Sequence, residues 1–424
     1  MKKLPGIRAL WQALRGHRHA NPTGSEYVDG EMPLIDEGIT DTGYYNEISF
    51  RYHSVQIICI MLLAVFLAVT LMTSAHVLSA DNFIYFVKDM ATTVADKEKE
   101  AKDTFVYASD EDNQYALYRE GLVVLGKQKL TVFTATGREA HSHLLSYQNP
   151  RLSSSGRYLA AYDMGGRSVS LYNSFTCVKE ITSDHAVRTM AICNKGYYCL
   201  ITDSAEYPSE VVLYNDRHRM INRYRLEEYT VCADLKPDGS ELVLTSVSAE
   251  MGRMVTHIAF ATPGKSEWGH SFEVKDAYPV ACQYTEEGNI RLLSTDALYL
   301  FSAKGEELSC YRFSSSEVLS FRMTEDSCVM ICRDDTSDRV TRVLAFDKMG
   351  NLEYNILVPR VARDACYVNG TLAVLCDGQL LLYRDTSEDT PIEVTLKGHY
   401  HTLLAYDNQE FLLCGDAKTI AVQP

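Results

Sequence analysis

The sequence predicts an all-β fold, a β-propeller of eight four-stranded blades, preceded by one transmembrane α-helix. Two observations predict it. Residues 54–80 contain no Asp, Glu, Lys or Arg. From residue 104 onward, short apolar strands separated by turns recur as a unit of about 41 residues, the mean spacing from Gly121 to Gln409 over seven steps. Four-stranded propeller blades have this length.

The first fifty residues are expected to form a cytoplasmic tail. They are polar and consist of a basic segment followed by an acidic one. Residues 1–20 carry five basic residues and no acidic one, whereas residues 21–50 carry seven acidic residues and no Lys or Arg. The whole chain has a formal net charge of −15. An acidic surface repels phosphate backbones, so the sequence argues against nucleic acid as a partner.

Residues 54–80 are long and apolar enough to cross a bilayer as a helix. A cleaved signal peptide is the alternative, but its charged N-terminal region would be far shorter than fifty residues. Basic residues precede the apolar segment, and the next one follows only at Lys88. The positive-inside rule therefore predicts a single-pass protein of the cell membrane with a cytoplasmic N-terminus. Residues 81–103 are expected to form a juxtamembrane stalk, and residues 104–424 an extracytoplasmic propeller.

Each repeat begins with a strand of small or apolar residues that ends in a turn. A second strand of apolar residues follows. A third strand ends in an aromatic residue, as in VSLYNS and VVLYND. Alternation with period two is typical of strands in stacked sheets. The last unit has only three strands, whereas one strand, TFVYAS at Thr104–Ser109, precedes the first unit. This strand is expected to complete the last blade and close the ring. The count is eight blades, with seven as the alternative.

Two turn sequences carry a resemblance to a known family. KPDG at Lys236–Gly239 and the Gly-His pair at Gly398–His399 resemble the turns of WD40-like propellers. The Trp-Asp position of those repeats is filled here by Tyr-Asn, Phe-Ser or Phe-Asp, as in Tyr172-Asn173 and Phe346-Asp347. The layout is similar to a bacterial family of single-pass, membrane-anchored propellers of no known activity. The resemblance implies the fold and the anchor, and no chemistry.

Cysteines are expected to serve mostly as small buried hydrophobic residues. Eleven of the twelve follow the apolar segment, and nine of these recur in or beside the first or second strands of different units. Corresponding positions in different blades are expected to lie too far apart for a disulfide. A bridge between Cys193 and Cys199, on adjacent strands of one blade, is the alternative.

Histidines form the only local cluster that suggests a metal. The candidates are His141, His143, His399 and His401, with His185 in a similar junction. We expect these junctions to lead from one blade's outer strand to the next blade's inner strand, near the central channel. Because the two His-x-His pairs are expected in non-adjacent blades, they should not share one ion, and no metal site is predicted.

No motif for nucleophilic catalysis, zinc proteolysis or nucleotide binding occurs, so no catalytic residue and no cofactor is predicted. Carboxylate pairs such as Glu286-Glu287 are expected in solvated turns. The predicted function is that of a membrane-anchored protein-binding or scaffold module of the cell envelope, with the bilayer and envelope proteins as partners. The alternatives are an ectoenzyme acting on glycans or peptides, and a transmembrane sensor.

Overall fold

The computed structural model describes residues 42–74, 104–108, 113–118, 121–134, 137–155, 158–173, 176–313, 318–334, 337, 339–384, 390–407 and 410–422. The predicted stalk and most of the predicted tail lie outside these residues. The chain divides into two units, Met1–Ala75 and His76–Pro424.

The first unit contains helix α2, Thr42–Ser74. It begins well before the predicted span, inside the segment that the sequence assigned to the tail. Among the described residues, no helix combines the length and apolarity of a membrane span.

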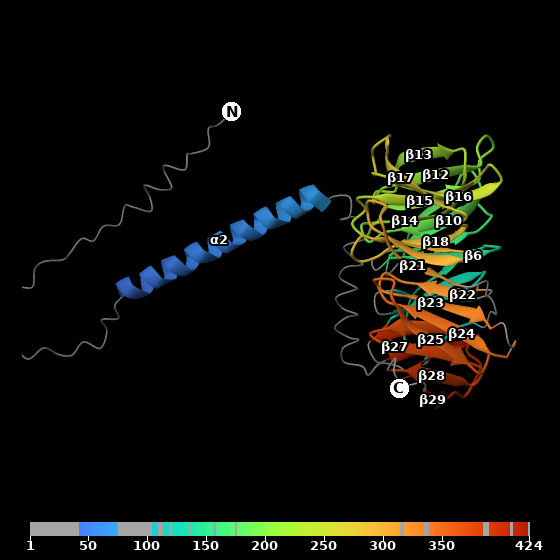
Figure 1. The fold of residues 1–424 in the computed structure, drawn as a ribbon. Helices are drawn as coiled ribbons and strands as arrows, with labels where there is room; N and C mark the ends of the chain where they lie inside the picture. Colours follow the sequence, from blue (N-terminus) through green and yellow to red (C-terminus); the bar gives the residue numbers. More distant parts are fainter. Residues whose placement is uncertain are drawn as a thin grey trace, which may run out of the picture. The chain divides into compact units, whose positions relative to one another are not determined.

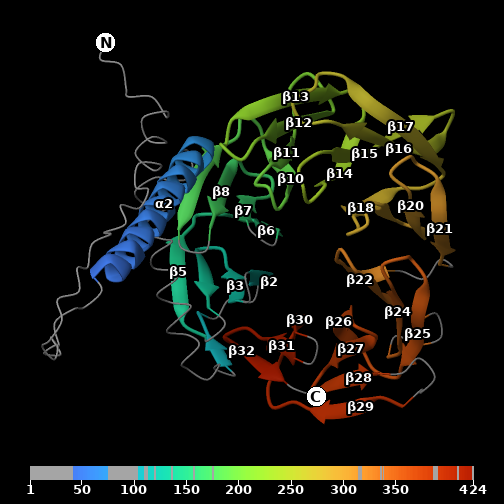
Figure 2. The same cartoon turned by 90° about the vertical axis from the view of Figure 1, so that its left-hand side faces the viewer.

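The second unit is an all-β ring of eight four-stranded antiparallel sheets, which confirms the predicted eight blades over seven (Figures 1 and 2). Blades 1 to 4 contain β2(Gln114–Tyr118), β3(Gly121–Leu125), β4(Lys129–Phe133), β5(Glu139–Leu144); β6(Pro150–Ser154), β7(Leu159–Asp163), β8(Ser168–Tyr172), β9(Cys177–Thr182); β10(Val187–Ile192), β11(Tyr198–Thr202), β12(Ser209–Tyr214), β13(Met220–Leu226); and β14(Tyr229–Leu235), β15(Leu242–Glu250), β16(Arg253–Ala261), β17(Trp268–Lys275).

Blades 5 to 8 follow the same order, from the innermost to the outermost strand. They contain β18(Pro279–Tyr284), β19(Ile290–Ser294), β20(Ala297–Phe301), β21(Glu307–Arg312); β22(Val318–Met323), β23(Cys328–Arg333), β24(Thr341–Phe346), β25(Leu352–Val358); β26(Ala362–Val368), β27(Thr371–Cys376), β28(Gln379–Tyr383), β29(Ile392–Thr395); and β30(Thr402–Asp407), β31(Glu410–Cys414), β32(Lys418–Val422), β1(Thr104–Val106).

The hydrophobic core lies between the blades, not within one central cluster. Each cluster of buried apolar side chains is formed by two neighbouring blades. For example, Val211 of blade 3 packs with Leu242 and Leu244 of blade 4. The second and third strands are apolar on both faces because each face meets another blade. Strands β3, β11 and β19 are accordingly buried along their full length.

Ring closure occurs as the sequence predicted. Strand β1 pairs antiparallel with β32, with Thr104 opposite Ile420 and Val106 opposite Lys418. The last blade therefore takes its outer strand from the N-terminal end of the propeller and its other three strands from the C-terminal end. Phe105 is buried, 2% exposed, among apolar residues of blades 8 and 1.

A buried arginine joins blades 5 and 6. Arg291 on β19 is 1% exposed. One terminal nitrogen donates to the carbonyls of Thr324 and Ser327 at 2.7 and 3.0 Å. The other donates to the carbonyls of Asp347 and Lys348 at 3.2 and 3.3 Å. The guanidinium thus satisfies turn carbonyls that would otherwise lose their hydrogen bonds on burial.

The up-and-down strand order gives the ring two different faces. One face, here the crossover face, carries the connections between successive blades and the turns between second and third strands. The other, the turn face, carries the turns between first and second strands and between third and fourth strands. Because β1 lies antiparallel to β32, Thr104 lies on the turn face.

The closure predicts a large difference between two neighbouring substitutions on β1. Phe105→Ala should lower the free energy of unfolding by about 3–5 kcal/mol, because a buried aromatic ring is lost between two blades. Val106→Ala, at a residue that is 71% exposed, should change it by less than about 0.5 kcal/mol. Urea unfolding of the two variants measures this, and equal losses would contradict the role of β1.

Candidate binding site

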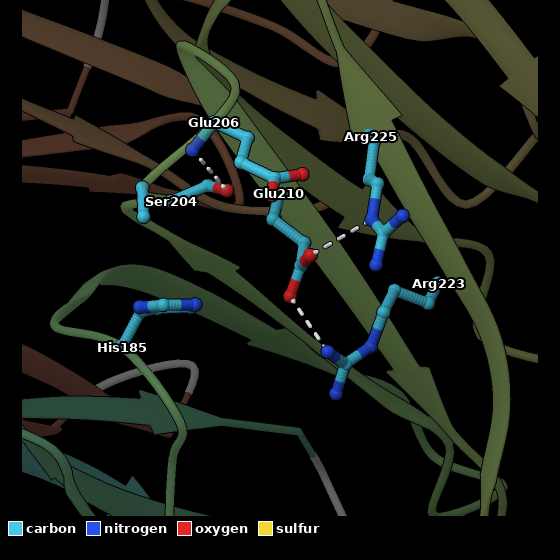
Figure 3. Close-up of a pocket in the computed structure, with 7 residues that line it drawn as sticks. His185, Ser204, Glu206, Glu210, Arg223 and Arg225 are labelled. Atoms are coloured by element: carbon cyan, nitrogen blue, oxygen red, sulfur yellow. Dashed lines mark hydrogen bonds and ion pairs between the residues drawn. The ribbon is translucent and has the colours of Figure 1, made fainter.

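A polar pocket lies on the crossover face between blades 2 and 3 (Figure 3). Its volume is about 200 Å³. His185 belongs to the connection between β9 and β10, and Ser204 and Glu206 to the turn between β11 and β12. Glu210, Arg223 and Arg225 complete the lining.

Strand register places the charged residues together. Glu210 on β12 is directly opposite Arg225 on β13, and Arg223 lies two residues earlier on the same face. Apolar residues alternate with them: Val211 faces blade 4 within the shared core. The charged group therefore lies on the opposite face of blade 3, which is directed toward blade 2 and the pocket.

Glu210 is the buried centre of the group, with a side chain that is 4% exposed. Arg223 Nη1 lies 3.3 Å from Glu210 Oε1, and Arg225 Nε lies 3.6 Å from Glu210 Oε2. Arg223 also donates to Asp184 Oδ2 at 2.8 Å. That hydrogen bond lowers the pKa of Asp184 and raises the pKa of Arg223. Figure 3 shows both guanidinium groups directed at the Glu210 carboxylate.

The charge balance decides what the pocket can bind. Guanidinium groups bind carboxylates and phosphates well. Here, however, Glu210 and Asp184 already neutralise Arg223 and Arg225. An anion would have to compete with the buried carboxylate of Glu210. The pocket is thus suited to a small polar group that adds hydrogen bonds to the half-exposed Arg225 and to His185.

His141 and His143 do not lie where the sequence analysis expected. They belong to β5, the outer strand of blade 1, and not to a junction near the channel. The Tyr172 hydroxyl is 2.8 Å from Nδ1 of His143, and Nε2 is 3.1 Å from Glu180 Oε1. Burial raises the pKa of Tyr172, so its hydroxyl stays protonated and remains a hydrogen-bond partner of the imidazole. The imidazole of His143 thus bridges Tyr172 on β8 and Glu180 on β9 of the next blade.

The other pair lies at the inner end of blade 8. His399 is in the connection from β29 to β30, and His401 immediately precedes β30. His401 Nε2 lies 3.2 Å from Asp416 Oδ1, an ion-pair distance without hydrogen-bond alignment. Blades 1 and 8 are neighbours in the closed ring, so the prediction that the pairs occupy non-adjacent blades was wrong. They still differ in position, one pair on an outer strand and the other beside an inner strand.

Two groups among the described residues have the side chains of metal sites. One consists of His143, Cys177 and Glu180, and the other of Glu250, His257 and Glu273. Burial raises the pKa of Cys177 to about 11, so a metal bound there would have to displace the proton of a thiol that ionises less readily than usual. Neither group contains both predicted histidine pairs.

None of the twelve cysteines forms a disulfide, including Cys193 and Cys199. Most are buried, as the sequence indicated. Equivalent cysteines can nevertheless share one cluster: Cys232 on β14 and Cys282 on β18 pack in the apolar cluster between blades 4 and 5. The neighbouring Cys232 thiol, followed by burial, raises the pKa of Cys282. The inner strands lie closest together in the ring, which explains the exception.

The inner strands also hold a carboxyl group with a shifted pKa. Asp234 on β14 accepts a hydrogen bond from the backbone N–H of Tyr284 on β18 at 2.7 Å. Burial raises the pKa of Asp234 to about 7, although backbone hydrogen bonds oppose the shift. The neutral carboxyl is therefore favoured in the folded chain over much of the acidic range.

Comparison with known proteins adds a family and confirms the fold. The model of a family of unknown function, DUF5711, matches residues 92–421. The chain belongs to this family. The match begins after the predicted membrane segment and runs from before β1 into β32, the last strand in the sequence. Among curated proteins, none is significantly similar to this DUF5711 chain in sequence.

Two solved structures share its architecture. BamB from Moraxella catarrhalis has a TM-score of 0.52 at 11% identity, over 77% of this chain and 99% of that one. A crystal structure described as the eukaryotic initiation factor has a TM-score of 0.50 at 12% identity, over 75% and 85% of the two chains. At these identities the likeness shows the propeller fold alone.

The buried carboxylate predicts a difference between two glutamates of the pocket. Glu210→Gln should lower the free energy of unfolding by about 1–3 kcal/mol, because two guanidinium groups lose a buried charged partner. Glu206→Gln, at an exposed residue of the same pocket, should change it by less than about 0.5 kcal/mol. Denaturant unfolding at pH 7 compares them, and a neutral Glu210→Gln would refute the assigned role.

The raised pKa of Asp234 predicts a pH-dependent effect of Asp234→Asn. Below about pH 4 the carboxyl is protonated in both the folded and unfolded chains. As the pH rises to about 7, only the unfolded chain releases the proton, so the wild type loses stability that the Asn variant keeps. From pH 4 to pH 8 the variant should gain about 3–4 kcal/mol relative to the wild type, because one pKa unit corresponds to about 1.4 kcal/mol. A pH-independent difference in urea unfolding would contradict this.

Proposed function

We propose that this chain is a membrane-anchored, extracytoplasmic β-propeller that serves as a protein-binding scaffold of the cell envelope. The observation that carries the proposal is the group of large apolar side chains exposed on the inner strands of the ring, including Val280, Leu319 and Phe321, which are 37–47% exposed. Apolar surface of this kind on a rigid fold is typical of protein interaction sites.

The anchor is supported by the composition of α2 and of the apolar segment that it enters. From Val55 to Phe66, all the large apolar side chains of α2 are 51–66% exposed. They occupy nine of the twelve positions from 55 to 66 and therefore surround the helix. A helix that is apolar on every side requires a non-aqueous environment. Because residues 54–80 are uncharged, the bilayer is the partner that fits.

Rigidity supports the scaffold role. Every blade shares its buried apolar side chains with both neighbours, and β1 closes the ring. Such a ring presents its faces without a cost in ordering the backbone when a partner binds. The proposed function uses this preformed surface and requires no catalytic group.

The proposed topology has a direct test. An alkaline phosphatase fusion after Pro424 should be active, because the enzyme matures only outside the cytoplasm, whereas a fusion at Ala20 should be inactive. The five basic residues before the apolar segment are the reason for this orientation. The reverse pattern of activity, or activity at both positions, would overturn the proposed location.

A further inference from the structure

Blades 4 to 6 expose apolar side chains on one side of the ring. We name this set the apolar rim: Tyr229, Met251, Met254, Tyr278, Leu319 and Phe321. Tyr229 begins β14, Tyr278 precedes β18, and Leu319 and Phe321 lie on β22, so three successive inner strands contribute (Figure 2). Their exposed fractions are 60%, 41%, 47% and 41%.

The hairpin of β15 and β16 extends the rim on the crossover face. These strands have nine residues each, against five or six in the second and third strands of the other blades. The Asp276 N–H donates to the carbonyl of Met254 at 2.9 Å, and Thr256 Oγ1 donates to that of Ala277 at 2.8 Å. Met254, which is 43% exposed, therefore lies beside the connection that carries Tyr278.

Met251, at the tip of the hairpin, adopts a backbone conformation that is unfavourable for methionine. Its φ is 48°, and that of Gly252 is 79°, so both turn residues are left-handed. Asn-Gly is the preferred pair for such a two-residue hairpin turn. Methionine has the Cβ penalty of the left-handed region, and its side chain is fully exposed at 106%. Packing within the chain does not explain a strained, exposed apolar residue, whereas contact with a partner does.

The charged side chains beside the apolar rim determine which kind of partner it can bind. Three carboxylates beside the hairpin surround His257: Glu228 and Glu250 lie 3.6 and 3.8 Å from Nε2, and Glu273 lies 3.7 Å from Nδ1. Their side chains are 34%, 56% and 47% exposed. The nearby Arg253 is paired with Asp276 at 3.7 Å. Arg188, which lies over the Tyr229 ring at 5.9 Å, is itself paired with Asp203. Even with the exposed Lys275 counted, the carboxylates beside the apolar rim outnumber the cations.

We propose that the apolar rim docks a polypeptide segment in which apolar side chains are flanked by lysine or arginine. This inference rests on the proposed scaffold function and names the face and the partner's chemistry. Flexible methionines adapt to an irregular apolar surface, and the two tyrosines provide large contacts of low conformational entropy. The carboxylates around His257 attract cationic residues and repel acidic peptides and anionic lipid surfaces.

Site-specific photocrosslinking in the full chain, in cells, tests the proposal. The photoreactive residue p-benzoylphenylalanine is placed at Met251 and, as a matched control, at Met349. Met349 is also an exposed turn methionine, at 43%, but it lies on the turn face of blade 6. Met251 should give at least five-fold more protein adduct than Met349. The crosslinked peptide, identified by mass spectrometry, should contain apolar residues with Lys or Arg beside them.

A second variant separates binding from stability. With the photoreactive residue moved to Tyr229, Met251→Asn should lower the adduct yield at least three-fold. The melting temperature should equal or exceed that of the Tyr229-labelled parent, because Asn suits the left-handed turn position. A lower melting temperature with unchanged adduct would mean that Met251 serves the fold, and would overturn the proposal.

The remaining outcomes are distinct. Adducts with acidic peptides or with lipid at Met251 would overturn the proposed partner chemistry. Adducts at Met349 alone would overturn this docking face and leave the scaffold function standing. Protein adducts at none of Met251, Tyr229 and Met349 would overturn both proposals.

Discussion

The pairing of β1 with β32 is the constraint on which the whole ring depends. Every other blade is built from one continuous segment of chain, whereas blade 8 needs strands from both ends. Since each hydrophobic cluster belongs to two blades, an open ring would expose the facing surfaces of blades 8 and 1 together. Three residues of β1 thus complete a sheet, cover an edge and join the first blade to the last. Because the two strands lie about 300 residues apart in the sequence, their pairing gains little from local structure and carries a high cost in chain entropy.

Polar side chains provide a second level of connection, between inner strands that have little apolar surface to share. Gln114 of blade 1 donates to the carbonyl of Pro150 and accepts from the N–H of Leu152. Asp234 accepts from Tyr284 in the next blade, and Asp364 accepts from Leu403. In each case a side chain replaces the strand that an inner edge lacks. This explains why single polar residues recur in strands that otherwise read as apolar.

The sequence predicted the features that repetition and burial enforce, namely the blade count, the strand order and the closure. Prediction from the sequence failed for strands that are exposed to solvent. Strand β5 contains Glu139, His141 and His143, and without an apolar alternation it reads as a loop. The segment GKSEWGH at 264–270 has no apolar alternation either, yet Trp268 begins β17 and its ring centroid lies 4.6 Å from that of Tyr224.

The pocket was missed for a related reason. Glu210 at a strand start reads as a solvated residue, and only His185 of the lining was noted. A period-two signal was present, because Arg223 and Arg225 follow on the next strand at positions that can share one face with Glu210. Recognising it required the register between the two strands, which depends on a bulge between Leu213 and Tyr214 that the sequence does not reveal.

Departures from the repeat are therefore more informative about function than the repeat itself. The buried second and third strands vary little in length because each must fit between two neighbours. The β15–β16 hairpin is longer because it projects beyond the neighbouring blades on the crossover face. Its tip holds Met251 in a left-handed conformation that selection for stability alone would not favour. On β22, the three successive residues Leu319 to Phe321 are exposed, unlike any run in the buried strands. Both departures fall in blades 4 to 6, and the carboxylates around His257 lie beside the first of them. Because closure holds the ring rigid, specificity depends on such local exceptions, and the proposed docking uses both of them.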